Sequence, residues 1–370
     1  MVPFCLVPRI ALHKNLVDFA AAFTVTDEDL IITNEFTQMG IRAANIPARL
    51  IFQEKFGLGE PSSSMMDSIF KEARKMPYKR VIAIGGGTVI DVAKLLALGG
   101  TGSTVDYFEG RVPVQKAHEL IIIPTTCGTG SEVTNIAIME IKEQKTKKGL
   151  ATDAIYADYA VLVPAVLASL PYKVFATSSM DALIHATESF VTPESNAVTE
   201  LFGTKAIAMI VRGYQAMADK GPAARIALME EFLLASTYAG IAFGNTGCGA
   251  VHAMSYPLGG IYHVPHGEAN QQLFTTIFKT YKKIQPQGKI EALEQLLGHL
   301  LNVPVSEVWT TFDRLLEMIL PRKPLKEYGM KETEIESFAD NVLKNQQRLL
   351  KNNYVPLSRE QMIDIYKELY

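Results

Sequence analysis

Two apolar runs in the first half of the sequence end in glycine-rich segments, and this pattern constrains the fold most strongly. Arg80–Ile84 is followed by Gly85-Gly86-Gly87, and Glu119–Pro124 is followed by the segment TTCGTGSE at residues 125–132. Runs that are apolar on both faces are typical of strands in a parallel sheet that helices cover on each side. Other segments continue the alternation: we expect strands at Leu30–Thr33 and Arg49–Phe52, and helices at residues 62–75 and 88–98.

The second half of the sequence has a different pattern, because the strand signal fades after about Pro164 and helical periodicity dominates. We predict helices at residues 178–191, 197–220, 223–242, 268–281, 289–301, 305–320 and 332–345. The sequence therefore predicts an α/β domain with a parallel sheet at residues 1–163 and an all-α domain at residues 164–370.

The composition narrows the range of partners. A formal net charge of −3 over 370 residues gives no case for binding to nucleic acid or membranes. No stretch reaches the roughly 20 apolar residues that a membrane span needs. Three widely spaced cysteines, Cys5, Cys127 and Cys248, indicate a reducing compartment rather than a disulfide framework. We therefore expect a cytoplasmic protein that binds neither nucleic acid nor membranes.

The triglycine segment is a candidate phosphate site. Backbone without Cβ atoms can approach a phosphate closely, and the N-terminus of the following helix attracts anions. A purely structural alternative is a capping box formed by Thr88 and Asp91. The segment is not a Rossmann fingerprint, because Ile90 occupies the third glycine position, and it lacks the Gly-Lys of a Walker A loop.

The second glycine-rich segment strengthens the case for a dinucleotide. It places two glycines and four hydroxyl side chains after a strand, although a structural loop remains the alternative. Cys127 lies within it, and we interpret this thiol as inert packing. At the end of the Leu30–Thr33 strand, a carboxylate would favour NAD over NADP, but the residue there is the neutral Asn34.

A pair of side chains in the second half could bind a metal. Asp181 and His185 are four residues apart on an expected helix, so they project from one face. Carboxylate and imidazole suit borderline divalent ions such as Fe²⁺ or Zn²⁺. On spacing alone, two structural roles compete: Ser178 and Asp181 could form a capping box, and His185 could be a hydrogen-bonded core histidine.

A second pair, His252 and His266, favours the metal. We expect Pro257 and the following glycines to break the helix that carries His252, so that the chain turns back and brings His266 to the same point. On spacing alone, His263 is an alternative ligand to His266.

Taken as whole motifs, the sequence resembles the iron-dependent (group III) alcohol dehydrogenase family, and within it most closely the 4-hydroxybutyrate dehydrogenases. The motifs are GGGTVID at 85–91, PTTCGTGSEVT at 124–134, MDALIHATES at 180–189, GAVHAMSYPLGG at 249–260 and HVPHGEAN at 263–270. The resemblance implies a dehydroquinate synthase-like fold, with a dinucleotide-binding α/β domain before a helical metal-binding domain. It also implies that Asp181, His185, His252 and His266 are the metal ligands, which selects His266 over His263.

The sequence departs from the family pattern near His252. Many members carry a second histidine four residues later, where this chain has Tyr256. Tyr256 is therefore our candidate for proton transfer, with water as the alternative route. By resemblance, Phe243 is expected to be an apolar wall of the substrate site.

The resemblance implies a reversible hydride transfer that depends on Fe²⁺ or Zn²⁺ and uses NAD, with 4-hydroxybutyrate and succinate semialdehyde as the substrate pair. The metal would act as a Lewis acid on the alcohol oxygen. Alternatives are a dehydrogenase for another small alcohol or diol, such as 1,3-propanediol or butanol, an NAD-dependent lyase like dehydroquinate synthase, and a non-catalytic nucleotide-binding protein. A homodimer is the expected assembly.

Two sets of residues complete these expectations. The residues predicted to bind the cofactor are Asn34, Gly85, Gly86, Gly87, Thr88, Asp91, Thr125, Thr126, Thr129, Thr134 and Lys148. The candidates to bind the distal carboxylate of the substrate are Lys173, Arg225 and Arg322.

Overall fold

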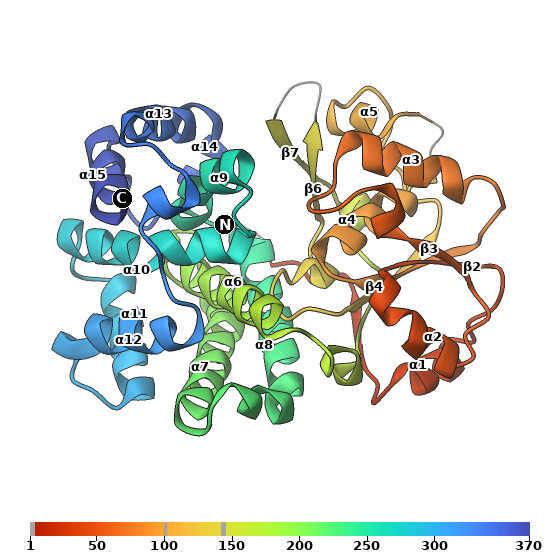
Figure 1. The fold of residues 1–370 in the computed structure, drawn as a ribbon, viewed down its shortest axis with the longest axis horizontal. Helices are drawn as coiled ribbons and strands as arrows, with labels where there is room; N and C mark the ends of the chain where they lie inside the picture. Colours follow the sequence, from red (N-terminus) through yellow and green to blue (C-terminus); the bar gives the residue numbers. More distant parts are fainter. Residues whose placement is uncertain (1–3, 100–101, 142–145) are drawn as a thin grey trace. The chain divides into compact units, whose positions relative to one another are not determined.

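A computed structural model describes residues 4–99, 102–141 and 146–370 of the chain. The chain divides into two compact units (Figure 1). One is Leu6–Leu170, and the other is Pro171–Tyr370 together with the first residues of the chain up to Cys5. The predicted domains, 1–163 and 164–370, stay a prediction.

The first unit is built on a six-stranded sheet with the order β1-β8-β5-β4-β2-β3, in which every pairing is parallel. The strands are β1 Arg9–Leu12, β2 Asp29–Thr33, β3 Arg49–Phe52, β4 Arg80–Gly85, β5 Glu119–Pro124 and β8 Tyr159–Leu162. The four predicted strands are among them. The sequence analysis missed β1 and β8, which are four residues long, and also an antiparallel hairpin of β6 Ile136–Ile141 and β7 Thr146–Ala151.

Helices cover both faces of this sheet. Side chains alternate along each strand, so each strand contributes residues to a core cluster on either face. From β4, Val81 and Ala83 join a cluster with α3 Ser63–Ala73 and α4 Gly87–Leu96. Ile82 and Ile84 join a second cluster on the other face. There they meet α1 Leu16–Ala22 and α2 Gln38–Ala43. The short α5 is Thr104–Phe108. The predicted parallel sheet with helices on both sides is therefore confirmed.

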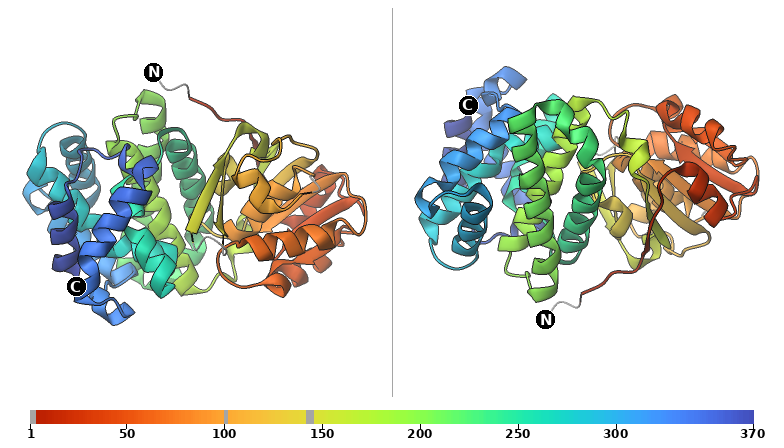
Figure 2. Two further views of the ribbon diagram at one scale, coloured as in Figure 1. Left: turned by 90° about the horizontal axis from the view of Figure 1, so that it is seen from above. Right: turned by 90° about the horizontal axis from the view of Figure 1, so that it is seen from below.

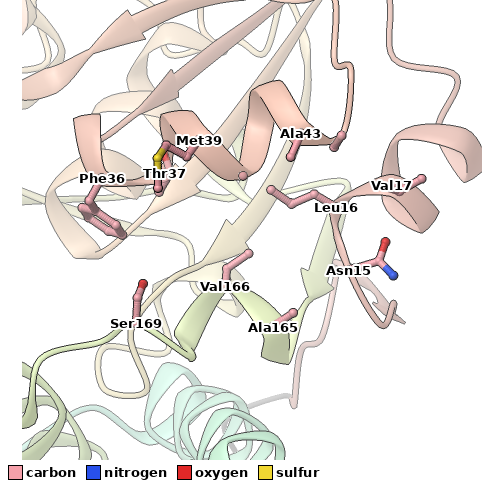
Figure 3. Close-up of a pocket in the computed structure, with 12 residues that line it drawn as sticks. Asn15, Leu16, Val17, Phe36, Thr37, Met39, Ala43, Ala165, Val166 and Ser169 are labelled. Atoms are coloured by element: carbon pink, nitrogen blue, oxygen red, sulfur yellow. The ribbon is translucent and has the colours of Figure 1, made fainter.

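A cavity of about 370 Å³ lies between α1, α2 and the short 3₁₀ helix Pro164–Leu167 (Figure 3). Its walls include Leu16, Phe36, Met39 and Val166. None of the residues that line it belongs to the glycine-rich segments or to the predicted metal ligands.

The second unit is helical in the residues that the structure describes. Its helices are α6 Tyr172–Val191, α7 Ala197–Lys220, α8 Met229–Thr246, α9 Ala250–Tyr262, α10 His266–Ile284, α11 Lys289–Leu301, α12 Val308–Ile319, α13 Ile335–Asn345, α14 Gln347–Leu350 and α15 Arg359–Leu369. Helices α6, α7 and α8 pack side by side at its centre (Figures 1 and 2). The predicted fold class, an α/β region followed by an all-α region, is confirmed.

Short 3₁₀ helices extend several of these elements. They are Glu35–Thr37, Gln53–Phe56, Ser131–Val133, Asp153–Ile155, Pro164–Leu167, Pro222–Leu228, Val305–Glu307, Leu325–Tyr328 and Glu332–Glu334. The segment Pro222–Thr246 is long and apolar enough to cross a membrane, yet 61% of its most apolar window is buried within the protein. Because a buried core helix can be equally long and apolar, this segment is weak evidence for a membrane span.

The structure corrects three local predictions. Helix α6 begins at Tyr172, so Ser178 lies inside it and donates to the Phe175 carbonyl instead of capping. Gly86 is the N-cap of α4, and Thr88 donates to the Gly59 carbonyl at 3.0 Å, so the Thr88–Asp91 capping box is wrong. Finally, α9 continues through Pro257 to Tyr262, and the chain turns only afterwards.

Asp91 instead belongs to a buried polar network around Lys94. The Lys94 ammonium donates to Ser131 Oγ at 2.8 Å, Thr134 Oγ1 at 3.1 Å and the Ile136 carbonyl at 2.6 Å. Asp91 accepts from Ser131 Oγ at 3.0 Å and from the Ile138 N–H at 2.9 Å. This network ties α4 to the chain that follows the second glycine-rich segment.

Burial lowers the pKa of Lys94 from 10.5 to about 8, even though Asp91 and Glu132 favour the charged form. Above pH 8 the folded protein releases this proton while the unfolded chain keeps it up to about pH 10.5. The unfolded state then binds more protons, so this group makes the folded state more stable as pH rises, by about 1.4 kcal/mol per pH unit.

We therefore predict that the free energy of unfolding of the native protein rises relative to that of Lys94→Met between about pH 8 and pH 10. Urea denaturation at a series of pH values measures both, with Lys205→Met, an exposed lysine of α7, as the control. Parallel pH profiles for the native protein and Lys94→Met would contradict the prediction.

Candidate metal centre

Three helices bring the four predicted ligands together. Helix α6 carries Asp181 and His185 one turn apart, and both are buried. Helix α9 contributes the buried His252, and His266 is the first residue of α10. The chain reverses between α9 and α10 at His263, whose backbone is left-handed with φ 54°.

The separations between these side chains suit a shared metal ion. Asp181 Oδ1 lies 3.4 Å from His252 Nε2 and 3.6 Å from His266 Nε2, and Asp181 Oδ2 lies 3.8 Å from His185 Nδ1. These distances exceed those of ordinary hydrogen bonds. Ligands that each lie about 2.1 Å from one tetrahedral ion are separated by roughly 3.4 Å. Asp181, His252 and His266 therefore form a group whose ligand atoms lie within 4.8 Å of one another, and His185 lies beside Asp181.

The electrostatics of the cluster also favour a cation. Burial alone would raise the pKa of Asp181, but His185, His266 and His252 outweigh it and hold this pKa well below its usual range. Burial would likewise lower the pKa of His252, yet Cys248, Asp181 and Glu188 raise it well above its ordinary value. The buried carboxylates of Asp181 and Glu188 thus create a site where positive charge is stabilised.

The Nε2 atom of His252 completes the test of fit. This atom is buried, and no residue in the described parts of the chain makes a well-formed hydrogen bond to it. A polar atom that is buried without a partner costs about 1–3 kcal/mol, and a metal would remove this cost. Three imidazoles and one carboxylate are ligands that Fe²⁺ and Zn²⁺ both accept.

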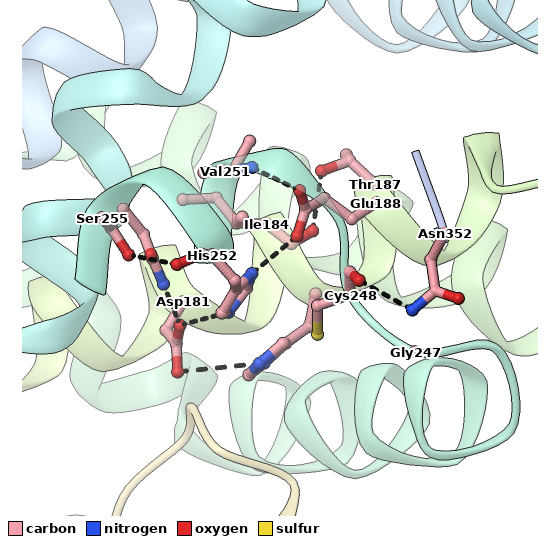
Figure 4. A network of polar contacts seen from close by, with 12 residues as sticks. Asp181, Ile184, Thr187, Glu188, Gly247, Cys248, Val251, His252, Ser255 and Asn352 are labelled. Carbon is pink, nitrogen blue, oxygen red and sulfur yellow. Dashed lines mark hydrogen bonds and ion pairs between the residues drawn. The ribbon is translucent and has the colours of Figure 1, made fainter. Parts of the chain in front are cut away.

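Glu188, which the sequence analysis did not single out, fixes His252 from the opposite side (Figure 4). One carboxylate oxygen lies 2.6 Å from His252 Nδ1, and the other accepts from the Val251 N–H at 2.7 Å. A proton on Nδ1 leaves Nε2 free to bind the metal. Glu188 follows His185 by three residues within the MDALIHATES motif, so helical spacing could have indicated it.

Asn270 supports Asp181 in a similar way. It is fully buried on α10, one turn after His266, and its side-chain amide donates to Asp181 Oδ1 at 2.8 Å. This contact fixes the orientation of the carboxylate that faces the three histidines.

The predicted catalytic residues lie at the edge of this cluster. The Phe243 ring, on α8, stacks on His185 with ring centroids 4.0 Å apart. Tyr256 is half-buried on α9, and its ring lies 6.1 Å from that of His266. Their roles as substrate wall and proton donor stay predictions. His263 is exposed at the turn and does not belong to either potential metal-binding group found among the described residues.

The structure also brings several predicted cofactor residues together in the first unit. Gly85 pairs with Pro124 across β4 and β5, and the Thr125 N–H donates to the Gly85 carbonyl at 3.0 Å. A Cβ atom on Gly86 would lie 3.3 Å from Thr126, and one on Gly87 would lie 3.0 Å from Thr129. The two glycine-rich segments are therefore in contact at the carboxyl ends of adjacent strands.

Other predicted cofactor residues have partners within the protein. Asn34, just after β2, donates to Glu54 at 2.8 Å. Asp91 and Thr134 are buried in the Lys94 network, and Lys148 on β7 lies 3.5 Å from Glu109. Contact of all these residues with a cofactor stays a prediction.

The three candidate cations for a substrate carboxylate differ in their surroundings. Arg322 binds Glu317 at 2.7 Å and lies 3.4 Å from Asp313. Arg225 lies over the rings of Tyr172 and Phe175. Lys173 is 73% exposed and lies 3.6 Å from Glu268.

Comparison with known proteins identifies the family of the chain. Residues 10–164 match the family described as iron-containing alcohol dehydrogenase, and residues 175–370 match the C-terminal region of the Fe-containing alcohol dehydrogenase family. The 4-hydroxybutyrate dehydrogenase of Clostridium kluyveri is 53% identical over 366 residues, which cover 99% of each chain.

Solved structures share the fold at lower identity. A sulfoacetaldehyde reductase from Bifidobacterium kashiwanohense, in complex with NAD⁺, aligns with a TM-score of 0.86 at 24% identity and covers 100% of this chain and 98% of that one. A 1,3-propanediol oxidoreductase aligns with a TM-score of 0.84 at 22% identity over 100% of both chains.

The contact between Glu188 and His252 yields a test. Replacing Glu188 with Gln removes the charge that holds the Nδ1 proton, so we predict that metal affinity falls by about 10–100-fold. Anaerobic titration of metal-free protein with Fe²⁺ against a competing chelator measures this affinity. Glu230→Gln, an exposed change in the first turn of α8, is the control. An unchanged affinity in Glu188→Gln would show that this carboxylate does not support the metal site.

Proposed function

Because the chain belongs to the iron-containing alcohol dehydrogenase family, we propose that it interconverts 4-hydroxybutyrate and succinate semialdehyde with NAD. The observation that carries this proposal is the cluster of Asp181, His185, His252 and His266, of which the first three are buried. The choice of substrate rests on 53% identity, over 99% of both chains, to a 4-hydroxybutyrate dehydrogenase.

The protein residues hold the reacting groups in place. When bound, Fe²⁺ supplies Lewis acidity toward the alcohol or carbonyl oxygen. Asp181 and the three histidines hold the ion, while Glu188 and Asn270 fix the orientation of two of these ligands. Phe243 covers one face of His185 and excludes water from it. Because hydride passes directly to the nicotinamide, the protein needs no nucleophile of its own.

The glycine-rich segments support binding of the cofactor. Helix α4 begins at Gly87 without a side-chain cap, so its first N–H groups can bind a diphosphate. The close packing of Gly86 and Gly87 on Thr126 and Thr129 leaves little room for side chains there. We propose NAD as the cofactor, a cytoplasmic location and a homodimeric assembly.

Two ligand variants test the metal centre. We predict that Asp181→Ala and His266→Ala each abolish bound metal and turnover, because each removes a direct ligand, while the fold survives. Metal analysis, NADH formation and circular dichroism measure these three properties. If either variant keeps its metal and full activity, the ligand set is wrong.

A substrate screen tests the proposed reaction itself. With Fe²⁺ and NAD, we expect 4-hydroxybutyrate to give a higher kcat/KM than 1-butanol or 1,3-propanediol. If the simple alcohols react better, the specificity proposal fails while the family assignment stands. Net NADH formation also separates this activity from that of a lyase, in which NAD is regenerated.

We propose Lys173 as the partner of the distal substrate carboxylate. Lys173 and Asp181 share α6, eight residues or about 12 Å apart along the helix axis. The Lys173 ammonium lies 3.6 Å from Glu268, two residues after the ligand His266, and its side chain is 73% exposed.

We predict that Lys173→Met raises the KM for 4-hydroxybutyrate about tenfold, as expected when a charge-assisted contact of 1–2 kcal/mol is lost. The KM for 1-butanol, which has no carboxylate, should not change. Initial-rate kinetics with both substrates measure the difference, and Lys173→Arg should retain most of the affinity. An equal change for both substrates would contradict the proposal.

A further inference from the structure

Cys248 lies beside the metal centre, and its thiol is not used by the proposed reaction. It is buried in the short connection between α8 and α9. Its sulfur and one ring nitrogen each of His185 and His252 all lie within 4.8 Å of one another. All three residues are buried. A buried cysteine usually packs against apolar groups, but this one faces two imidazoles.

The backbone around Cys248 is anchored on both sides. The Cys248 carbonyl accepts from the Asn352 amide at 3.0 Å (Figure 4). Gly247 adopts φ +79°, and a Cβ atom there would lie 2.3 Å from Asn352. A Cβ atom on Gly249 would lie 3.2 Å from Glu188. The glycines therefore let this connection pack tightly, and the tight packing fixes the backbone position of Cys248.

We propose that His185, His252 and Cys248 form a second metal-ligand set, which overlaps the first and binds a thiophilic divalent ion such as Zn²⁺. Two imidazoles and a thiolate are preferred zinc ligands, whereas the first set offers a carboxylate in place of the thiolate, and such a set accepts Fe²⁺ as well. Bonds of about 2.1 Å to nitrogen and 2.3 Å to sulfur separate such ligands by roughly 3.6 Å. The ligand atoms lie within 4.8 Å of one another, so they must approach by at most about 1 Å to share one ion. A small rotation of the Cys248 side chain can bring the sulfur that much closer.

Binding in this set involves no redox change. The metal–sulfur bond replaces the S–H bond, and the proton leaves to solvent. Because the two sets share His185 and His252, one ion occupies one set at a time. An ion bound through Cys248 gives up Asp181 and His266, so thiophilic ions compete with the Fe²⁺ form of the enzyme.

Co²⁺ is the probe that distinguishes the two sets, because a thiolate ligand adds a sulfur-to-cobalt charge-transfer band in the near ultraviolet. We expect this band when the metal-free full-length protein is titrated with Co²⁺ under anaerobic conditions. Cys248→Ala and the nearly isosteric Cys248→Ser should both lose it. His252→Ala should also lose it, whereas His266→Ala should keep it, since His266 belongs only to the first set.

Cys127→Ala is the matched control, because it removes another buried thiol that lies in the other unit, and it should leave the band unchanged. The proposal is overturned if Co²⁺ binds the native protein without this band, if the band survives in Cys248→Ala or Cys248→Ser, or if Co²⁺ does not bind at all. The spectrum is independent of turnover, so failure of the 4-hydroxybutyrate proposal would leave this result intact.

Discussion

The buried Asp181 carboxylate is the group on which the helical unit depends most. It lies on the central helix α6 and faces three histidines at 3.4–3.8 Å. A charge removed from water in this way is costly unless opposite charge compensates it. The three histidines supply part of this compensation, since they hold the pKa of Asp181 well below its usual range, and we propose that a divalent ion bound by all four side chains supplies the rest. Glu188 and Asn270 then hold the ligands in position.

The sheet unit obeys a different constraint, which is close approach of the backbone. Gly85-Gly86-Gly87 runs from the end of β4 into α4 and packs on the segment after β5, so the two segments are in contact at the carboxyl ends of parallel strands. On α4, Lys94 binds Ser131, Thr134 and the Ile136 carbonyl. The buried Lys94 ammonium, with its three oxygen partners, therefore ties α4 to residues 131–136.

Much of this arrangement could be predicted from the sequence, but the basis differed between residues. The apolar runs at β2, β3, β4 and β5 could be predicted, whereas β1 and β8 were missed; length alone does not explain this, because β3 is also four residues long. Spacing alone left Asp181 open to a capping role, and the structure excludes this because α6 begins at Tyr172. The choice of His266 over His263 came from the family resemblance.

Some features were out of reach because they depend on contacts between distant segments. From local spacing, Asp91 was interpreted as a capping residue. Its true partners, Ser131 and Ile138, follow it by 40 residues or more, so no local pattern indicates them. Pro257 was expected to end a helix, yet α9 continues through it to Tyr262. Cys248 lies near His185 because α8 packs against α6 and Glu188 of α6 contacts Val251 and His252 of α9, which no local pattern shows.

The position of the bound metal tests most directly whether Asp181 and the three histidines are its ligands. Anomalous X-ray diffraction at the iron edge, from crystals of the Fe²⁺-loaded protein, locates the ion without reference to activity. We predict one peak about 2.0–2.2 Å from an Asp181 oxygen and from one nitrogen each of His185, His252 and His266. A peak that lies elsewhere, or one beyond bonding distance of Asp181, would contradict the account.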